Sequence, residues 1–304
     1  MMKYLVIGAG GTGGCLAAYL GAAGKDVHVI ARGEHLKAIQ ANGLVLETGH
    51  RGTFAVPVKA SDMEHYNDTP DVILLCVKGY SINDCIPFIR KVAKENTVVI
   101  PILNGFGIGG SIQPELPGVL VTDGCIYIAA EIKAPGTILM SGAALKVFFG
   151  VRKPEDYRPV LEEIAQDLKE CGIEGGVSEN IQRDALQKFS FVSPMAACGL
   201  YYDVKAASMH KDGVERETFV ALVKEVEGLA KAMDITFPVD IVTNNLGILD
   251  NLAPGASTSL KRDVDAGKNS ELDTLLFQVV RLGKQLGVAT PWYEKVAAKM
   301  GFQG

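Results

Sequence analysis

Hydrophobic and polar positions follow one pattern before about residue 178 and a different one after it. In the first part, short apolar runs alternate with amphipathic stretches. Asp71–Val77 is typical of a strand buried on both faces, and Asn83–Ala93 is typical of a helix, although Pro87 interrupts it. In the second part, the apolar positions have helical spacing only. We therefore predict an α/β fold, with an N-terminal Rossmann-type doubly wound sheet in residues 1–178 and an all-α C-terminal domain in residues 179–304.

The same patterns predict the remaining elements. In the first part, helices are expected at Glu34–Gln40 and Pro154–Cys171, and short strands at Leu44–Leu46, Phe54–Val58, Thr97–Ile100 and Gly172–Glu174. Antiparallel strands, separated by glycine turns, are expected at Gly118–Ile132, Thr137–Met140 and Leu145–Gly150. In the second part, helices are expected at Glu179–Tyr202, Val214–Met233, Pro238–Leu252, Ser257–Val264 and Ser270–Leu286.

A glycine-rich turn follows the first apolar strand. The strand ends at Ile7, the motif Gly8-x-Gly10-x-x-Gly13 comes next, and a helical segment and a second strand, Asp26–Ile30, complete the unit. In such a unit the first glycine permits a tight turn, the second lets the backbone approach a pyrophosphate, and the third lets helix and strand pack closely. This context predicts a dinucleotide site rather than a purely structural turn.

The end of the second strand indicates which dinucleotide binds. A site for NAD usually has an acidic residue there, which bonds the ribose 2′-hydroxyl. This chain has Ala31-Arg32-Gly33 instead, and a guanidinium would attract a 2′-phosphate. We therefore predict NADP(H), with the alternative that Arg32 is a solvated loop arginine beside Glu34.

Three loops are expected to meet at one edge of the sheet. Gly8–Gly13, Val77-Lys78-Gly79 and Leu103-Asn104-Gly105 each follow a predicted strand. In a doubly wound sheet, ligands bind outside the carboxyl ends of the strands. These loops are therefore predicted to face one crevice, which would hold cofactor and substrate.

Composition excludes several other classes of function. A net charge of −5 gives no reason to expect nucleic acid or an anionic membrane as a partner. No apolar run reaches the roughly 18 residues of a membrane span. The six cysteines are scattered and the five histidines have no metal-ligand spacing, so we expect reduced thiols, a cytoplasmic protein and no metal site. The apolar faces of the helical part could support a homodimer.

Taken in order, the motifs resemble those of the ketopantoate reductase (2-dehydropantoate 2-reductase) family, over essentially the whole chain. The matching segments are Gly8-Ala9-Gly10-Gly11-Thr12-Gly13, Arg32, Val77-Lys78, Leu103–Gly107, Ala185–Phe189, Ser259–Asp263 and Glu271–Asp273. The resemblance implies reduction of a 2-keto acid by NADPH, most simply ketopantoate to pantoate in coenzyme A biosynthesis. It also implies that Gly8, Gly10, Gly11, Thr12, Gly13, Arg32, Lys78 and Asn104 contact the cofactor.

The resemblance further implies roles in catalysis and substrate binding. Lys188 would be the general acid that protonates the carbonyl oxygen, and Glu271 would hold Lys188 and contact the substrate. Asn104 would orient Lys188 or the substrate, Ser259 would bind the substrate carboxylate, and Asp263 would support the helix that carries Ser259. These roles suit the chemistry, because hydride transfer to a ketone creates an alkoxide that needs a proton.

On pattern alone, each of these residues has a simpler interpretation. Lys188 and the Ser259–Asp263 pair could lie on solvated helix faces, and Lys78 could point into solvent. Glu271 could favour a helix N-terminus, and Asn104 could make a turn.

The chain departs from the family pattern on the substrate side. The family places asparagines one and two turns after the catalytic lysine, where this chain has Val192 and Ala196. A further family asparagine falls near Ala206, and Thr290-Pro291-Trp292-Tyr293 replaces the family's Thr-Pro-x-Asn. A site that lacks these partners loses discrimination for substrate hydroxyls.

Three functional hypotheses follow. The first is an NADPH-dependent 2-keto acid reductase with ketopantoate as substrate. The second is an enzyme of the same architecture for a different, more apolar 2-keto or hydroxy acid, as Val192 and Ala196 would favour. The third is a non-catalytic NADP(H)-binding protein, against which the retained Lys188, Glu271 and Asn104 argue.

Overall fold

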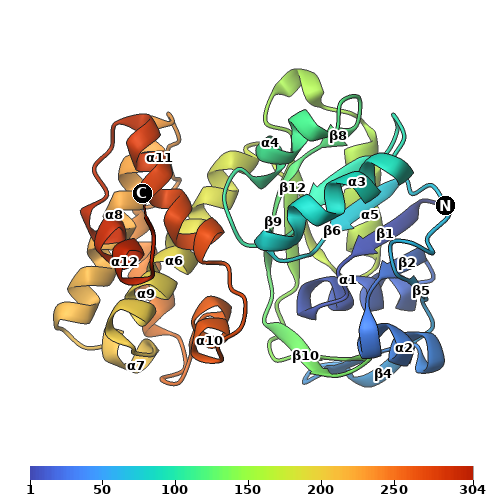
Figure 1. Cartoon of the computed structure of the whole chain (residues 1–304), viewed down its shortest axis with the longest axis horizontal. Coiled ribbons are helices and arrows are strands. Elements are labelled where there is room, and N and C mark those ends of the chain that lie inside the picture. Colours follow the sequence, from blue (N-terminus) through green and yellow to red (C-terminus); the bar gives the residue numbers. More distant parts are fainter. Residues whose placement is uncertain (304) are drawn as a thin grey trace. The chain divides into compact units, whose positions relative to one another are not determined.

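The computed structural model describes residues 1–303 and divides into two compact units (Figure 1). The first unit contains Met1–Leu103 and Gly107–Ile181, and the second contains Asn104–Phe106 and the described residues from Gln182 onward. The first is built on a sheet and the second on helices, so the predicted fold class is confirmed.

The first unit is organised around a six-stranded sheet in which every neighbouring pair is parallel. Its order is β5-β2-β1-β6-β7-β8, which is the strand order of dinucleotide-binding sheets. The strands are β1 (Lys3–Ile7), β2 (Asp26–Ile30), β5 (Lys59–Ser61), β6 (Val72–Leu75), β7 (Val98–Pro101) and β8 (Leu120–Val121). The topological switch point therefore lies between β1 and β6, where the chain order reverses.

Both faces of this sheet are buried. In β1, Tyr4 and Val6 pack into one hydrophobic cluster, whereas Leu5 and Ile7 pack into another. This alternation explains the continuous apolar runs of β1 and β6, because successive side chains of a strand point to opposite faces. The helices of this unit are α1 (Gly11–Ala22), α2 (Gly33–Asn42), α3 (Ile82–Val92), α4 (Ile108–Ile112) and α5 (Val160–Glu170).

The segment Gly118–Ile132 differs from its prediction as one strand. It forms β8, then β9 (Asp123–Tyr127), and then begins β10 (Ala130–Ala134), and the three strands join three different sheets. β10 pairs with β11 (Thr137–Met140) in the sheet β10-β11-β3-β4, and β9 pairs with β12 (Lys146–Gly150) in the sheet β13-β12-β9. The other strands are β3 (Leu44–Thr48), β4 (Gly52–Val56) and β13 (Glu174–Val177).

The antiparallel prediction for these strands is only partly right. β11 is antiparallel to β10 but parallel to β3, and β12 is antiparallel to β9 but parallel to β13. An alternation of apolar residues predicts a strand but does not identify the strand with which it pairs. Sequence reasoning therefore could not find these parallel pairings.

The second unit is helical. Its helices are α6 (Ile181–Tyr202), α7 (Ala206–Met209), α8 (Val214–Ala232), α9 (Ile241–Asp250), α10 (Ser259–Asp265), a π-helix (Asp273–Phe277), α11 (Gln278–Leu286) and α12 (Pro291–Lys299).

Helix α12 was not predicted. It begins with proline at its first position, and the carboxylate of Glu225 on α8 accepts hydrogen bonds from the amides of Trp292 and Tyr293. Burial raises the pKa of this carboxyl, against the opposing effect of the two amides.

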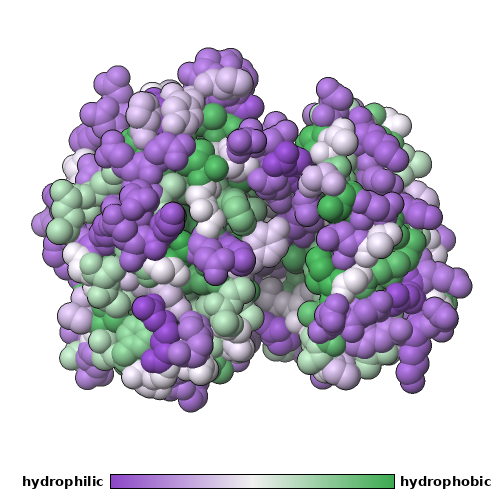
Figure 2. Space-filling view, turned by 180° about the vertical axis from the view of Figure 1, so that it is seen from behind, coloured by the Kyte–Doolittle hydropathy of each residue, from purple (hydrophilic) through white to green (hydrophobic). Residues whose placement is uncertain are grey.

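The surface of the protein carries both hydrophobic and hydrophilic residues. On the face drawn in Figure 2, hydrophobic residues occur among hydrophilic ones over both units. Large apolar side chains that are exposed are dispersed along the chain: Met1, Tyr80, Tyr127, Ile132, Tyr157, Val214, Val239 and Ile248. Among the described residues, no helix combines the length and apolar character needed to span a membrane.

Candidate functional site

The glycine motif forms a tight loop between β1 and α1. Gly8 has φ +97°, and a Cβ there would lie 2.9 Å from the Cys76 carbonyl oxygen. A Cβ on Gly13 would overlap the Gly8 carbonyl oxygen, and one on Gly11 would overlap the Ala130 carbonyl. These three glycines are therefore required by the packing of the protein itself.

Gly10 is different, because a Cβ there would meet nothing within 4 Å. Gly10 is the N-cap of α1 and has no side-chain capping hydrogen bond, and the first turn of α1 contains no acidic residue. Open space thus lies over a helix N-terminus whose amides carry partial positive charge. Thr12 is partly exposed on this first turn. The loop leaves room for a pyrophosphate, and the contact of Gly10 with a cofactor stays a prediction.

Two basic residues follow β2 and β6, the two strands that flank β1, at the carboxyl edge of the sheet. Arg32 is exposed at the N-cap of α2, just after β2, and Lys78 is half-buried just after β6. Glu34 forms an ion pair with Lys37, with Nζ and Oε1 2.8 Å apart, so Glu34 is engaged within its own helix. Among residues 1–303, no acidic side chain forms an ion pair with Arg32.

His35 supports the glycine loop, a role that sequence reasoning missed. The Gly136 amide donates to Nδ1 of His35 at 2.9 Å, so Nδ1 carries no hydrogen in this arrangement. Nε2 lies 2.8 Å from the Ala9 carbonyl oxygen and must be the protonated nitrogen that donates to it. The neutral ring therefore ties the loop to the turn between β10 and β11. Its partners are main-chain atoms, so no side-chain motif could have revealed it.

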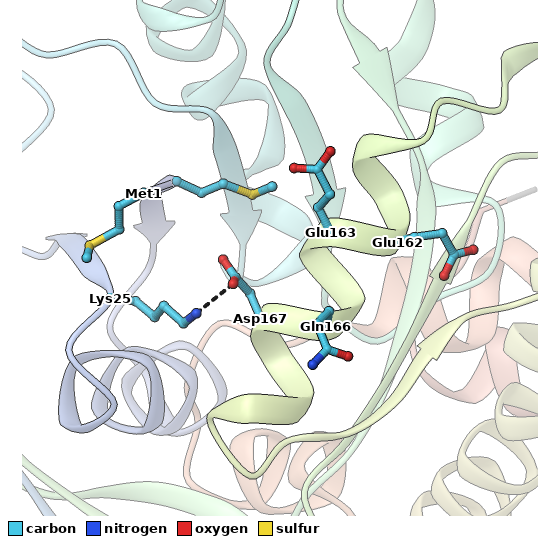
Figure 3. Close-up of a pocket in the computed structure, with 7 residues that line it drawn as sticks. Met1, Lys25, Glu162, Glu163, Gln166 and Asp167 are labelled. Carbon is cyan, nitrogen blue, oxygen red and sulfur yellow. Dashed lines mark hydrogen bonds and ion pairs between the residues drawn. The ribbon is translucent and has the colours of Figure 1, made fainter.

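A surface hollow of about 520 Å³ beside α5 does not suit a dinucleotide (Figure 3). It is lined by Met1, Met2, Lys25, Glu162, Glu163, Gln166 and Asp167. Met1 and Met2 precede β1 and Lys25 precedes β2, so the hollow lies at the amino ends of the strands, away from the glycine loop. The Lys25 ammonium is paired with Asp167 at 2.6 Å, and Glu162 and Glu163 would repel phosphates.

In the second unit, the structure brings Lys188 and Asn104 together. Lys188 is half-buried on α6, and its Nζ donates to Asn104 Oδ1 at 3.1 Å. Asn104 belongs to the segment Asn104–Phe106, which groups with the helical unit although it follows β7 in the chain. An ammonium that donates to an amide oxygen has a fixed direction, which is what a proton donor requires.

The other residues proposed for the substrate side lie on α10 and just before the π-helix of the same unit. Glu271 is buried, with 3% of its surface exposed, and precedes the π-helix Asp273–Phe277. Ser259 is half-buried in the first turn of α10. Thr258 caps this helix, because its side-chain oxygen accepts a hydrogen bond from the Lys261 amide. Asp263 follows one turn later on α10. The roles of Glu271, Ser259 and Asp263 in binding stay predictions.

The three apolar residues at the positions of the family asparagines differ in how far they are exposed. Val192 is partly exposed one turn after Lys188, whereas Ala196 and Ala206 are completely buried. Of the three, Val192 is the one with surface left for a ligand. Among the described residues, no group of three or more His, Cys, Asp or Glu side chains could hold a metal ion.

Comparison with known proteins identifies the family. Residues 4–153 match the model of ketopantoate reductase PanE/ApbA, and residues 180–302 match the model of its C-terminal part. The chain belongs to the ketopantoate reductase family. The family assignment from the motifs is thereby confirmed, and the chain is a member of a group of oxidoreductases.

Alignments with similar proteins extend over almost the whole length of this family member. The 2-dehydropantoate 2-reductase of Mesorhizobium japonicum is 27% identical, over 98% of this chain and 96% of its own length. The crystal structure of 2-dehydropantoate 2-reductase from Porphyromonas gingivalis W83 has a TM-score of 0.84 and 29% identity, over 98% of this chain and 99% of that one. A ternary structure of D-mandelate dehydrogenase with NADH and anilino(oxo)acetate has a TM-score of 0.88 and 23% identity, over 98% and 96%, and shows a shared fold.

Proposed function

We propose that this ketopantoate reductase family member reduces a 2-keto acid to the 2-hydroxy acid with NADPH, and that ketopantoate is its first candidate substrate. The observation that carries the proposal is the hydrogen bond from Lys188 Nζ to Asn104 Oδ1. It joins two residues that, by the family resemblance, would act at the reacting carbonyl group of the substrate. The curated relatives named 2-dehydropantoate 2-reductase support the same reaction.

The residues of the first unit fit an NADP(H) cofactor. Gly10 leaves room for a pyrophosphate over the N-terminus of α1, and Arg32 and Lys78 follow strands β2 and β6. Arg32 would hold the 2′-phosphate, Lys78 would lie near the phosphates, and Asn104 would lie beside the nicotinamide. When bound, NADPH supplies the hydride that adds to the carbonyl carbon of the substrate.

The protein's own residues would then handle the charge on oxygen. Lys188 gives its proton to the carbonyl oxygen as the carbon is reduced, so an alkoxide never accumulates. Asn104 accepts a hydrogen bond from the Lys188 ammonium and so directs it. Ser259, in the first turn of α10, would bind the substrate carboxylate, and Glu271 would hold Lys188 and contact the substrate.

Replacing Arg32 by Ala is expected to lower kcat/KM with NADPH while changing kcat/KM with NADH little. One charge-assisted contact to a phosphate is worth about 1.5–3 kcal/mol, so the NADPH-to-NADH ratio should fall by roughly 10- to 100-fold. Steady-state kinetics with both cofactors measure the ratio, and Lys169→Ala, at an exposed position on α5, is the control. An unchanged ratio in Arg32→Ala would remove Arg32 from cofactor selection.

The substrate can be identified by comparing the kcat/KM values of several 2-keto acids. Oxidation of NADPH by the wild-type chain is measured with ketopantoate, which carries a hydroxyl, and with branched and aromatic 2-keto acids, which do not. A ketopantoate reductase should have its highest kcat/KM with ketopantoate. A preference for the apolar acids would instead favour the second candidate function, for which the partly exposed Val192 is the structural argument. Failure with every acid would contradict both, and would leave a non-catalytic NADP(H)-binding protein.

A further inference from the structure

We propose that Gln278 is a positioning residue that holds the Asn104–Phe106 segment on the helical unit and so keeps Asn104 paired with Lys188. The inference rests on the proposed function of that pair. Gln278 is the first residue of α11, and its Nε2 donates to the Phe106 carbonyl oxygen at 2.5 Å, across 172 positions of the chain. No motif of the family resemblance contains Gln278.

The segment has few other attachments. Within residues 1–303, Asn104, Gly105 and Phe106 make no hydrogen bond with other main-chain groups. The glycines at positions 105 and 107 have φ of +142° and +68°, values that other residues rarely adopt, and glycine-rich backbone resists ordering because of its conformational entropy. The position of Asn104 must therefore be set from outside the segment, by Gln278, by Lys188 and by packing of the buried Phe106 ring.

The elements that carry Gln278 and Lys188 are themselves joined. Ser193, on α6 five residues after Lys188, donates from Oγ to the carbonyl oxygen of Leu275 in the π-helix, at 2.6 Å. The Tyr293 hydroxyl lies 2.6 Å from the same Oγ and must donate to it, because the hydrogen of Ser193 is already used. Ser193 and Tyr293 are buried, so this connection is shielded from water. Gln278 thus projects from a frame that is fixed relative to the Lys188 helix.

The Gln278 amide is only half satisfied. Its Oε1 is buried and has no hydrogen-bond partner among the described residues, while Nε2 makes the bond to Phe106. A buried acceptor without a partner costs free energy, so a methionine of similar length would be as good or better if packing were all that mattered. The π-helix that leads directly into Gln278 is of the rare kind found at functional sites.

The test compares Gln278→Met with Gln285→Met, a matched change on the exposed side of the same helix. In Gln278→Met the Phe106 carbonyl loses its donor, so kcat for 2-keto acid reduction should fall by roughly 10- to 100-fold while the KM for NADPH stays near its wild-type value. Gln278→Lys restores a donor without Oε1 and should recover much of kcat. Equal kcat in Gln278→Met and Gln285→Met would overturn the proposal.

Hydrogen exchange separates this inference from the proposed function. Amide exchange of peptides spanning residues 104–112 should accelerate in Gln278→Met and not in Gln285→Met, whether or not a substrate is known. Unchanged exchange there would overturn the positioning role even if kcat falls in Gln278→Met. If the wild-type chain reduces no 2-keto acid, the proposed function fails while faster exchange would still support Gln278 as the anchor of the segment.

Discussion

Replacing Lys188 by Met is expected to lower kcat for 2-keto acid reduction by about 10²- to 10⁴-fold, the usual contribution of a general acid. Methionine keeps most of the aliphatic length but has no proton to give and no donor for Asn104 Oδ1. Binding of NADPH, followed by its fluorescence, should change little, because the cofactor fingerprint lies on the other unit.

Dependence on pH provides a second signature of Lys188. If Lys188 is the proton donor, reduction needs the protonated amine and oxidation of the hydroxy acid needs the neutral amine, so raising the pH should slow the first reaction and favour the second. Lys224→Met, at an exposed position on α8, is the matched control and should behave as wild type. If Lys188→Met retained wild-type kcat, or if reduction stayed constant far into the alkaline range, the lysine would not be the proton donor.

Replacing Gly13 and Gly10 by Ala should produce two different defects in one loop. A Cβ on Gly13 would overlap the Gly8 carbonyl oxygen, so the loop must shift, and Gly13→Ala should lower the free energy of unfolding by roughly 1–3 kcal/mol as well as impair NADPH binding. A Cβ on Gly10 would enter open space at φ −70°, so Gly10→Ala should cost less stability than Gly13→Ala, about 1 kcal/mol or less from the preference for glycine over alanine at an N-cap.

The added methyl group in Gly10→Ala would occupy the approach of the pyrophosphate, and the Kd for NADPH should rise by about tenfold or more. Gly247→Ala, on an exposed face of α9, controls for the general effect of a glycine replacement. Thermal unfolding and NADPH titration of all three variants separate the two effects. Normal NADPH affinity in Gly10→Ala would show that the pyrophosphate does not pass over this residue.

The sequence predicted the first unit well where local rules decide the structure. The glycine motif and the position of Arg32 after β2 follow from spacing within one βαβ unit, and the buried strands β1 and β6 follow from their continuous apolar runs. Pairings between distant segments could not be predicted, because apolar alternation carries no information about the partner. The three strands formed by Gly118–Ile132 and the parallel pairing of β11 with β3 are examples.

Residues that act through main-chain atoms were also beyond prediction. His35 binds the Ala9 carbonyl and the Gly136 amide, and Gln278 binds the Phe106 carbonyl, and bonds to main-chain atoms leave no residue pattern that a motif would reveal. A signal did exist for α12, since Thr290-Pro291 ahead of an apolar segment is typical of a helix start.

Transfer of deuterium tests the central claim most directly. The wild-type chain is incubated with ketopantoate, or another 2-keto acid, and NADPH that carries deuterium at the reactive C4 position, and the product is analysed by mass spectrometry. Reduction by hydride transfer predicts a 2-hydroxy acid with deuterium on C2, formed by the wild type and formed about 10²- to 10⁴-fold more slowly by Lys188→Met. A chain that binds NADPH but yields no deuterated hydroxy acid from any 2-keto acid would contradict the account.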